Sequence, residues 1–228
     1  YHLLLQDKKV GYIALEESNK RSALGFVGLY LNKPVHLNEK VSEEELKSGF
    51  DATLGTGNLY FYDHWGSMEI ENLLGKIKYM VRAMGCEYII LDHISIVISG
   101  IEGGDERRMI DVAMTKLRSL CEEVQCGLIL VSHLRRPSGD RGHEEGVKTS
   151  LSQLRGSHAI AQLSDIVIGC ERDQQGDNPD MTTVRVLKNR WTGETGIATH
   201  LYYSKETGRL TETQLTEVKQ DEEDNPDF

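Results

Sequence analysis

The sequence of 228 residues lacks any apolar run close to the roughly 18 to 20 residues that a membrane-spanning helix needs. Its first residues, YHLLLQDKKVGYIALEES, also lack the layout of a secretory signal peptide. The hydrophobic share of 39% is that of an ordinary globular domain and is enough for one sizeable core. We therefore expect one main domain that is soluble and intracellular and has no membrane segment.

Cysteine is scarce, and its spacing excludes the common zinc sites. The four cysteines do not form C-x-x-C pairs, and each lies in or beside an apolar segment. We therefore expect reduced thiols in the core rather than metal ligands. These residues are Cys86, Cys121, Cys126 and Cys170.

Positive charge is in deficit, since the formal net charge is -10. This argues against a protein that coats nucleic acid with its whole surface, because phosphate binding requires a local density of Lys and Arg. The charges are distributed unevenly. Residues 213–228 are rich in Asp and Glu and are expected to form a disordered acidic tail, whereas the composition of 134–155 predicts a basic loop with Gly, Ser and Pro.

Two hydrophobic periodicities alternate along the chain. Apolar residues recur at helical spacing over 70–84 and 109–124. The alternation of strands and helices predicts an α/β fold, with a mostly parallel sheet covered by helices on both faces. Short apolar runs typical of buried strands occur at 10–15, 58–62, 88–91, 127–131, 165–169 and 183–187.

Local signals refine this outline. Ser42 with Glu45 three residues later forms a capping box, which predicts the start of a short polar helix. Turn sequences at 176–179 and 205–208 separate the strands of the C-terminal part. Strands joined by such short turns are expected to pair antiparallel.

In open α/β sheets, ligands bind outside the carboxyl ends of the strands, so the polar residues that end each strand are the candidates for a site. Four strands end in such pairs. They are Glu16 with Glu17, Asp92 with His93, Ser132 with His133, and Lys188 with Arg190.

The carboxylates among these residues suit nucleotide hydrolysis. Asp92 follows a strand buried on both sides, where a carboxylate can hold Mg²⁺ through water. Glu16 or Glu17 could polarise a water for attack on a γ-phosphate. Taken singly, each signal has a simpler interpretation, because Asp often ends a strand in a turn and Glu is favoured at the start of a helix.

The cationic and imidazole side chains suit contacts with phosphate. His133 could donate a hydrogen bond to a phosphate oxygen, although a lone His is more often a packing residue. Lys188 and Arg190 lie two apart after a strand, so both side chains leave the same face. Paired cations that face outward suit a finger inserted into a neighbour's phosphate site, but they could equally be an exposed charged edge.

The basic segment RRPSGDRGHEEG and the following SLSQLRGS combine flexible glycines with guanidinium groups. This combination suits a sugar-phosphate backbone, and the lack of interleaved aromatics favours phosphate contact over base reading. A solvated loop balanced by Glu144 and Glu145 is the alternative for Arg141 and Lys148.

Several blocks occur in a characteristic order between about Val10 and Leu210: LEES, YIILDHISIV, SHLRRP, SLSQLRGS, QLSD, LKNRWTGETGIA and KETG. Together they resemble the helicase half of phage primase-helicases and, more distantly, mitochondrial Twinkle and bacterial DnaB. The resemblance implies a RecA-like ATPase core at 1–212. It also implies a hexameric, NTP-driven 5′ to 3′ translocase on single-stranded DNA that uses Mg²⁺ and ATP or dTTP.

Roles follow for the residues that match the family's motifs. The resemblance implies that Glu16 is the catalytic base, that Asp92 is the Walker B carboxylate that binds Mg²⁺ through water, and that His133 is the γ-phosphate sensor. It implies that Lys188 and Arg190 reach the nucleotide of the adjacent subunit. Arg172 and Tyr203 match residues that flank the nucleotide base. The residues matching the central DNA-gripping loops are Arg135, Arg136, Arg155, Gly156 and Ser157.

The sequence also departs from the family pattern. The phosphate-binding loop G-x-x-x-x-G-K-[ST] is expected roughly 20 to 30 residues before Glu16, which lies before Tyr1. The chain is therefore expected to be a fragment that by itself is inactive and binds nucleotide poorly. His158 stands where relatives usually carry Gly, which makes the inner loop bulkier.

The resemblance extends to partners. The acidic tail 213–228 is similar to a tail that docks the replicative DNA polymerase, and a primase domain is expected in the same parent chain. A phage-infected bacterial cytoplasm is the expected location, ahead of a mitochondrial matrix. Two other functions remain open: a recombinase or clock-type ATPase on the same fold, and a non-catalytic module that binds DNA or docks the polymerase.

Overall fold

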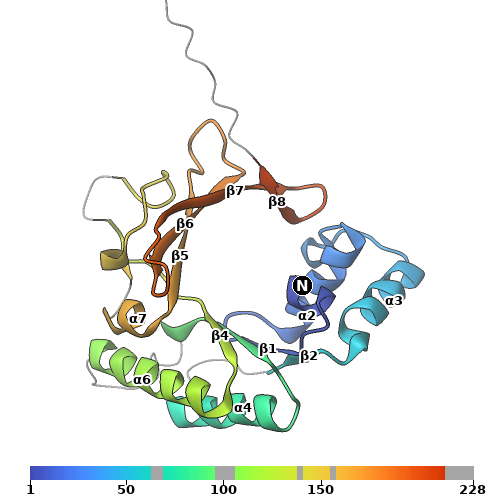
Figure 1. Ribbon diagram of the computed structural model, residues 1–228. Coiled ribbons are helices and arrows are strands. Elements are labelled where there is room, and N and C mark those ends of the chain that lie inside the picture. Colours follow the sequence, from blue (N-terminus) through green and yellow to red (C-terminus); the bar gives the residue numbers. More distant parts are fainter. Residues whose placement is uncertain (63–68, 96–105, 138–140, 155–157, 214–228) are drawn as a thin grey trace, which may run out of the picture.

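The computed structural model describes residues 1–62, 69–95, 106–137, 141–154 and 158–213. The described strands form two four-stranded sheets (Figure 1). The first is parallel, in the order β2-β1-β3-β4, and the second is antiparallel, in the order β5-β6-β7-β8. The parallel strands are β1 Val10–Ala14, β2 Leu59–Phe61, β3 Tyr88–Asp92 and β4 Gly127–Leu130. The antiparallel strands are β5 Ile166–Arg172, β6 Met181–Asn189, β7 Gly196–Ser204 and β8 Arg209–Thr213.

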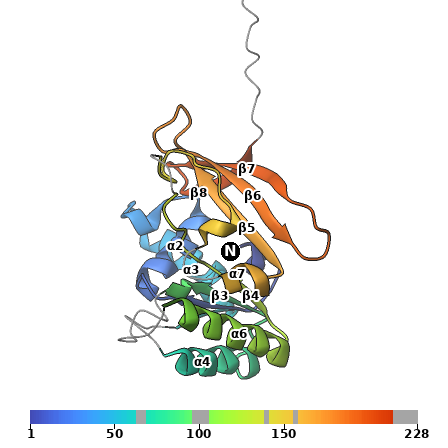
Figure 2. The same ribbon diagram turned by 90° about the vertical axis from the view of Figure 1, so that its left-hand side faces the viewer.

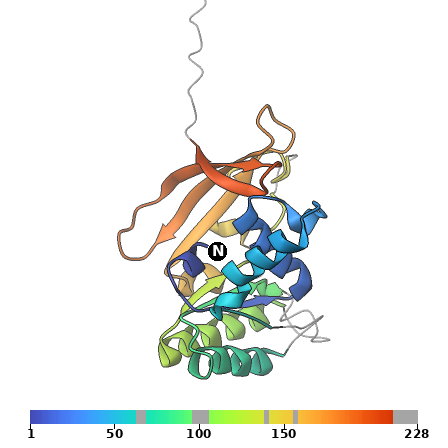
Figure 3. The ribbon, with the colours of Figure 1, turned by 90° about the vertical axis from the view of Figure 1, so that its right-hand side faces the viewer.

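Helices lie on both faces of the parallel sheet. In Figures 2 and 3, α4 and α6 lie on one side of it, while α2, α3 and the antiparallel sheet lie on the other. The α-helices are α1 His2–Leu5, α2 Asn19–Leu31, α3 Glu43–Ala52, α4 Ile70–Arg82, α6 Glu106–Val124 and α7 His158–Leu163. Short 3-10 turns occupy Val35–Leu37, Leu54–Thr56 and Leu151–Gln153. No described helix has the length and apolarity needed to cross a membrane.

The main core lies between the parallel sheet and the helices α4 and α6. Fully buried side chains from β3, α4 and α6 meet there, among them Ile89, Leu73 and Ile110. Each such side chain contributes about 1.5 to 3 kcal/mol by leaving water. The helical spacing of apolar residues over 70–84 and 109–124 therefore reports a real core face. A smaller cluster packs on the other face, where the rings of Tyr12 and Phe26 meet edge to face with centroids 5.8 Å apart.

The predicted capping box is confirmed. The side chain of Ser42 accepts a hydrogen bond from the Glu45 amide, and the Glu45 carboxylate accepts one from the Ser42 amide, so α3 begins where the sequence indicates. The antiparallel pairing of the C-terminal strands is also confirmed. β8, which the strand signals of the sequence did not predict, completes that sheet.

The prediction of a fully buried strand at 165–169 is wrong. β5 alternates, because Val167 is buried while Ile166 and Ile168 are 47% and 57% exposed. The prediction of core thiols is wrong for Cys170, which lies on the same exposed side of β5. On β4, Ile129 is likewise exposed, so apolar composition overstates burial at both strands.

Candidate active site

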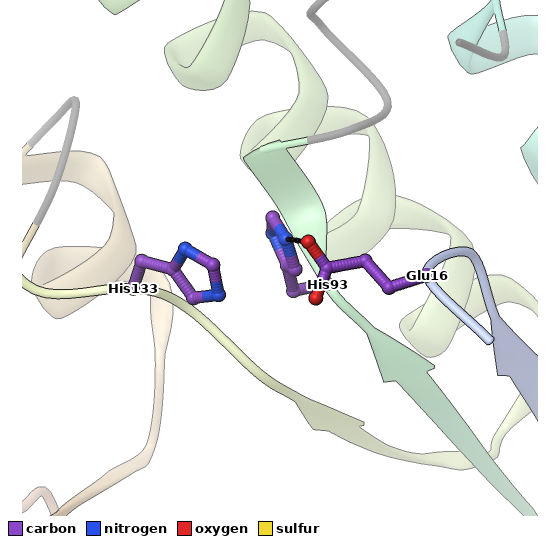
Figure 4. Close-up of side chains that lie close together, drawn as sticks. All are labelled: Glu16, His93 and His133. Carbon is purple, nitrogen blue, oxygen red and sulfur yellow. Dashed lines mark hydrogen bonds and ion pairs between the residues drawn. The ribbon is translucent and has the colours of Figure 1, made fainter. Parts of the chain in front are cut away.

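Three loops converge at the carboxyl ends of β1, β3 and β4. Backbone hydrogen bonds continue past the strands, from the Leu15 amide to the Asp92 carbonyl at 2.8 Å and from the Val131 amide to the Leu91 carbonyl at 2.9 Å. The Ile94 amide in turn donates to the Val131 carbonyl at 3.2 Å. These bonds hold the three departing chains side by side, so the next side chains meet at one edge of the sheet (Figure 4).

Glu16 is held at this edge by His93. The Nε2 atom of His93 lies 2.8 Å from Oε1 of Glu16, and the Ser95 amide donates to Nδ1 of the same ring at 3.2 Å. Because Nδ1 accepts a hydrogen bond, Nε2 carries the proton and donates it to the carboxylate. This hydrogen bond is the main cause that lowers the pKa of Glu16, so the carboxylate is held as an anion.

His133 completes a row of three side chains. Its ring lies against that of His93, with centroids 3.9 Å apart and planes inclined by 33°. Figure 4 shows His93 between Glu16 and His133. His93 is buried, whereas the two outer side chains are exposed and can reach a ligand.

The same three residues offer donor atoms that lie within 4.8 Å of one another, close enough to hold a metal ion. The hydrogen bonds favour another interpretation. Nε2 of His93 carries a proton that it shares with Glu16, since the Ser95 amide occupies the lone pair of Nδ1. A nitrogen that carries a proton cannot bind a metal ion at the same time. The row is therefore a hydrogen-bonded array of protein groups.

Asp92 is the carboxylate that fits a cation. It ends β3, is partly buried, and accepts no side-chain hydrogen bond from the described residues. Burial is the main cause that raises its pKa; Glu16 and Glu17 add to this, while His93 and His133 oppose it. A partly buried carboxylate without a donor is a natural partner for a hard divalent cation such as Mg²⁺, which prefers oxygen ligands.

The structure separates the two candidate glutamates. Glu16 faces His93, whereas Glu17 accepts a hydrogen bond from Oγ of Ser22 at 2.5 Å and lies 3.8 Å from the Arg21 guanidinium. Ser22 and Arg21 belong to the first turn of α2. Glu17 therefore supports the start of that helix, and the choice of Glu16 for the site agrees with the geometry.

Lys188 and Arg190 both bind the C-terminal end of α7. The Lys188 ammonium donates to the carbonyls of Ala161, Gln162 and Ser164, and Arg190 donates to that of Gln162 and pairs with Asp165. Both cations thus lie on one side, as the spacing predicts. They contact their own chain, because a helix C-terminus presents unpaired carbonyls that attract cations. Their reach to a neighbouring subunit stays a prediction.

The two residues expected to flank a base meet at Asp180. Arg172 donates to the Pro179 carbonyl at 2.5 Å and pairs with the Asp180 carboxylate at 3.3 Å. The Tyr203 amide donates to the Asp180 carbonyl at 2.9 Å. Asp180 thus ties the end of β5 to β7, and nothing in its sequence context distinguished it from other turn residues.

The predicted DNA-contacting residues are only partly described. Arg135 and Arg136 are exposed, and the Arg135 amide donates to the Gln153 carbonyl at 2.7 Å. A bridge between Leu134 and Leu154 closes the basic segment into a loop. The remaining predicted residues, Arg155, Gly156 and Ser157, lie outside the described residues, as does the acidic tail from 214 onward.

Comparison with protein families matches residues 8–212 to the DnaB-like helicase C terminal domain. The chain is 40% identical over 214 residues to the DNA helicase/primase of Enterobacteria phage T3, covering 92% of this chain and 38% of that protein. It is 26% identical over 190 residues to a probable plasmid replicative DNA helicase of Chlamydia trachomatis, covering 81% of this chain and 40% of that one. The chain thus spans well under half the length of these relatives.

Solved structures show the same fold. One of them, the isolated ATPase domain of another protein, superposes with a TM-score of 0.73 at 18% identity, covering 92% of this chain and 76% of that one. A DnaB-like replicative helicase, whose structure also concerns its interactions with primase, gives a TM-score of 0.73 at 19% identity, covering 90% and 52%. The RecA-like ATPase architecture expected from the sequence is therefore confirmed.

Proposed function

We propose that this chain, which belongs to the DnaB-like helicase C-terminal domain family, is the motor part of an NTP-driven replicative DNA helicase. The observation that carries the proposal is the meeting of Glu16, His93 and His133 beside Asp92 at one edge of the parallel sheet. This edge is where an α/β sheet binds its ligand. The arrangement provides an anionic base, a cation ligand and an imidazole within reach of one substrate.

The residues divide the hydrolysis of a nucleoside triphosphate between them. Glu16, held as an anion, orients and polarises the attacking water. Asp92 would hold Mg²⁺, which neutralises phosphate charge when it is bound. His133, exposed next to His93, donates to an oxygen of the γ-phosphate, and Lys188 and Arg190 supply positive charge to the nucleotide of an adjacent subunit. Arg172 and Tyr203 bind the base of ATP or dTTP.

The assembly and partners are part of the same proposal. The chain acts in a hexameric ring that moves 5′ to 3′ on single-stranded DNA, which the basic loop and residues 155–157 grip through phosphate. The likeness to a phage helicase/primase supports a primase domain in the parent protein and a location in the cytoplasm of an infected bacterium. The acidic tail would dock the replicative polymerase.

The test is hydrolysis of ATP and dTTP by the complete protein, including any residues before Tyr1, with and without single-stranded DNA. Wild type should show hydrolysis that DNA stimulates, and Glu16→Gln should lose it by at least about 100-fold. Glu17→Gln is the matched control, because it removes the adjacent charge from the start of α2 and should retain most activity. Equal losses in the two variants, or hydrolysis retained by Glu16→Gln, would refute the role of Glu16.

A further inference from the structure

His93 is the buried member of the site and has contacts on three sides. One ring nitrogen lies 2.8 Å from the Glu16 carboxylate, the other accepts from the Ser95 amide at 3.2 Å, and the ring lies 3.9 Å from that of His133. The residue is 3% exposed. Its ring is therefore fixed in orientation, because rotation would break both hydrogen bonds at once.

Glu16 depends on a partner for its orientation. Its side chain is 53% exposed, and the only hydrogen bond it makes within the described residues is the one to His93. A long carboxylate side chain without such a bond would sample several rotamers. The general base of a hydrolase must instead keep its oxygen aimed at one water.

We propose that His93 is a positioning residue that aims the Glu16 carboxylate and sets its spacing from His133. The inference rests on the proposed function of Glu16. His93 itself does not touch the substrate. It transmits orientation through its Nε2 proton on one side and through ring contact on the other, so the base and the phosphate contact form one rigid unit.

Two substitutions separate this role from simple packing. The amide of Asn reaches the position of Nδ1, so His93→Asn keeps the acceptor for the Ser95 amide and loses the donor to Glu16. The longer Gln reaches the position of Nε2, so His93→Gln restores a donor to Glu16. Both are smaller polar replacements at the same buried position, which makes them a matched pair.

The measurement is the steady-state hydrolysis of the complete protein on single-stranded DNA, together with binding of a fluorescent nucleotide analogue and thermal unfolding. His93→Asn should lower kcat by about 10- to 100-fold, the range expected when a reacting group is misplaced by about 1 Å. KM and analogue affinity should change less than about 2-fold, since ground-state binding is untouched. His93→Gln should recover most of the lost kcat.

A double variant distinguishes this proposal from the proposed function. In the Glu16→Gln background, His93→Asn should produce no further loss, because residues that act as a unit are not additive. If Glu16→Gln retains hydrolysis, the role of Glu16 fails. If Glu16→Gln abolishes hydrolysis and His93→Asn does not lower kcat, only the positioning role fails.

Equal effects of Asn and Gln on kcat, KM and melting temperature would show that His93 serves packing alone and would overturn the proposal. Should His93→Asn fail to fold, His93→Gln decides against wild type. A kcat within about 5-fold at unchanged KM supports positioning. A parallel fall in kcat and in nucleotide affinity contradicts it.

Discussion

Glu171 on β5 provides the sharpest test of the energetics of this fold. Its carboxylate accepts hydrogen bonds from the Arg185 guanidinium at 2.7 and 2.9 Å and from the amide and hydroxyl of Thr149 at 2.7 and 2.8 Å. The side chains of Glu171 and Arg185 are only 8% and 14% exposed. Burial by itself raises the pKa of Glu171, but the bonds from Arg185 and Thr149 outweigh it and lower the pKa from 4.5 to about 2.

The change to make is Glu171→Gln, which mimics the protonated carboxyl. A tenfold difference in acid dissociation constant corresponds to about 1.4 kcal/mol. The lowered pKa therefore corresponds to a loss of about 3 kcal/mol in the free energy of unfolding near neutral pH. The folded pKa lies below the unfolded one, so this stability is present above pH 4.5 and disappears as the pH falls toward about 2.

The assay is urea unfolding of wild type and variant at about pH 7 and about pH 3, with urea chosen because it does not screen charge. The difference between the two proteins should shrink by more than half at the lower pH. Glu87→Gln is the control, because Glu87 pairs with Lys8 at 2.8 Å where the side chains are 47% and 38% exposed, and an exposed pair contributes about 0 to 1 kcal/mol. A Glu171 difference below about 1 kcal/mol at neutral pH, or one independent of pH, would refute the reasoning.

Three further outcomes follow from local geometry. In α2, Gly28→Ala should cost about 1 to 3 kcal/mol because its Cβ would lie 2.5 Å from the Lys33 carbonyl oxygen, whereas Gly25→Ala meets no atom within 4 Å and should stabilise the helix in urea unfolding. The Cys86 thiol, buried with its pKa raised to about 11, should react with iodoacetamide only after unfolding, and peptide mass spectrometry showing equal labelling of native protein would contradict this. Lys188→Met should speed hydrogen exchange in α7, whose terminal carbonyls lose a charged donor; unchanged exchange would mean that the cation does not hold the helix.

Periodicity and strand ends were enough to predict much of the fold and part of the site. The carboxyl ends of parallel strands lie at one edge, so Glu16 and His133 could be placed together without coordinates. Contacts between particular atoms could not be predicted. His93 follows Asp92 as an ordinary polar residue, and only the backbone pairing of β1 with β3 brings it to Glu16.

Other outcomes depended on context that a single sequence does not carry. The spacing of Lys188 and Arg190 indicates a shared face, but it does not reveal the α7 carbonyls that both cations bind. Apolar composition predicted a buried β5, since an isoleucine is expected to be buried wherever it stands in a strand. Its actual exposure depends on which elements cover each face of the sheet.

The exposed isoleucines on β4 and β5 have a consequence for handling the protein. Among the described strands, β4 pairs only with β3 and β5 only with β6, so each leaves one backbone edge unpaired beside apolar side chains such as Ile129 and Ile168. Unpaired apolar edges are templates for adding strands from other copies. This stretch prepared by itself should therefore self-associate, and protein concentration will set the window in which its unfolding can be measured.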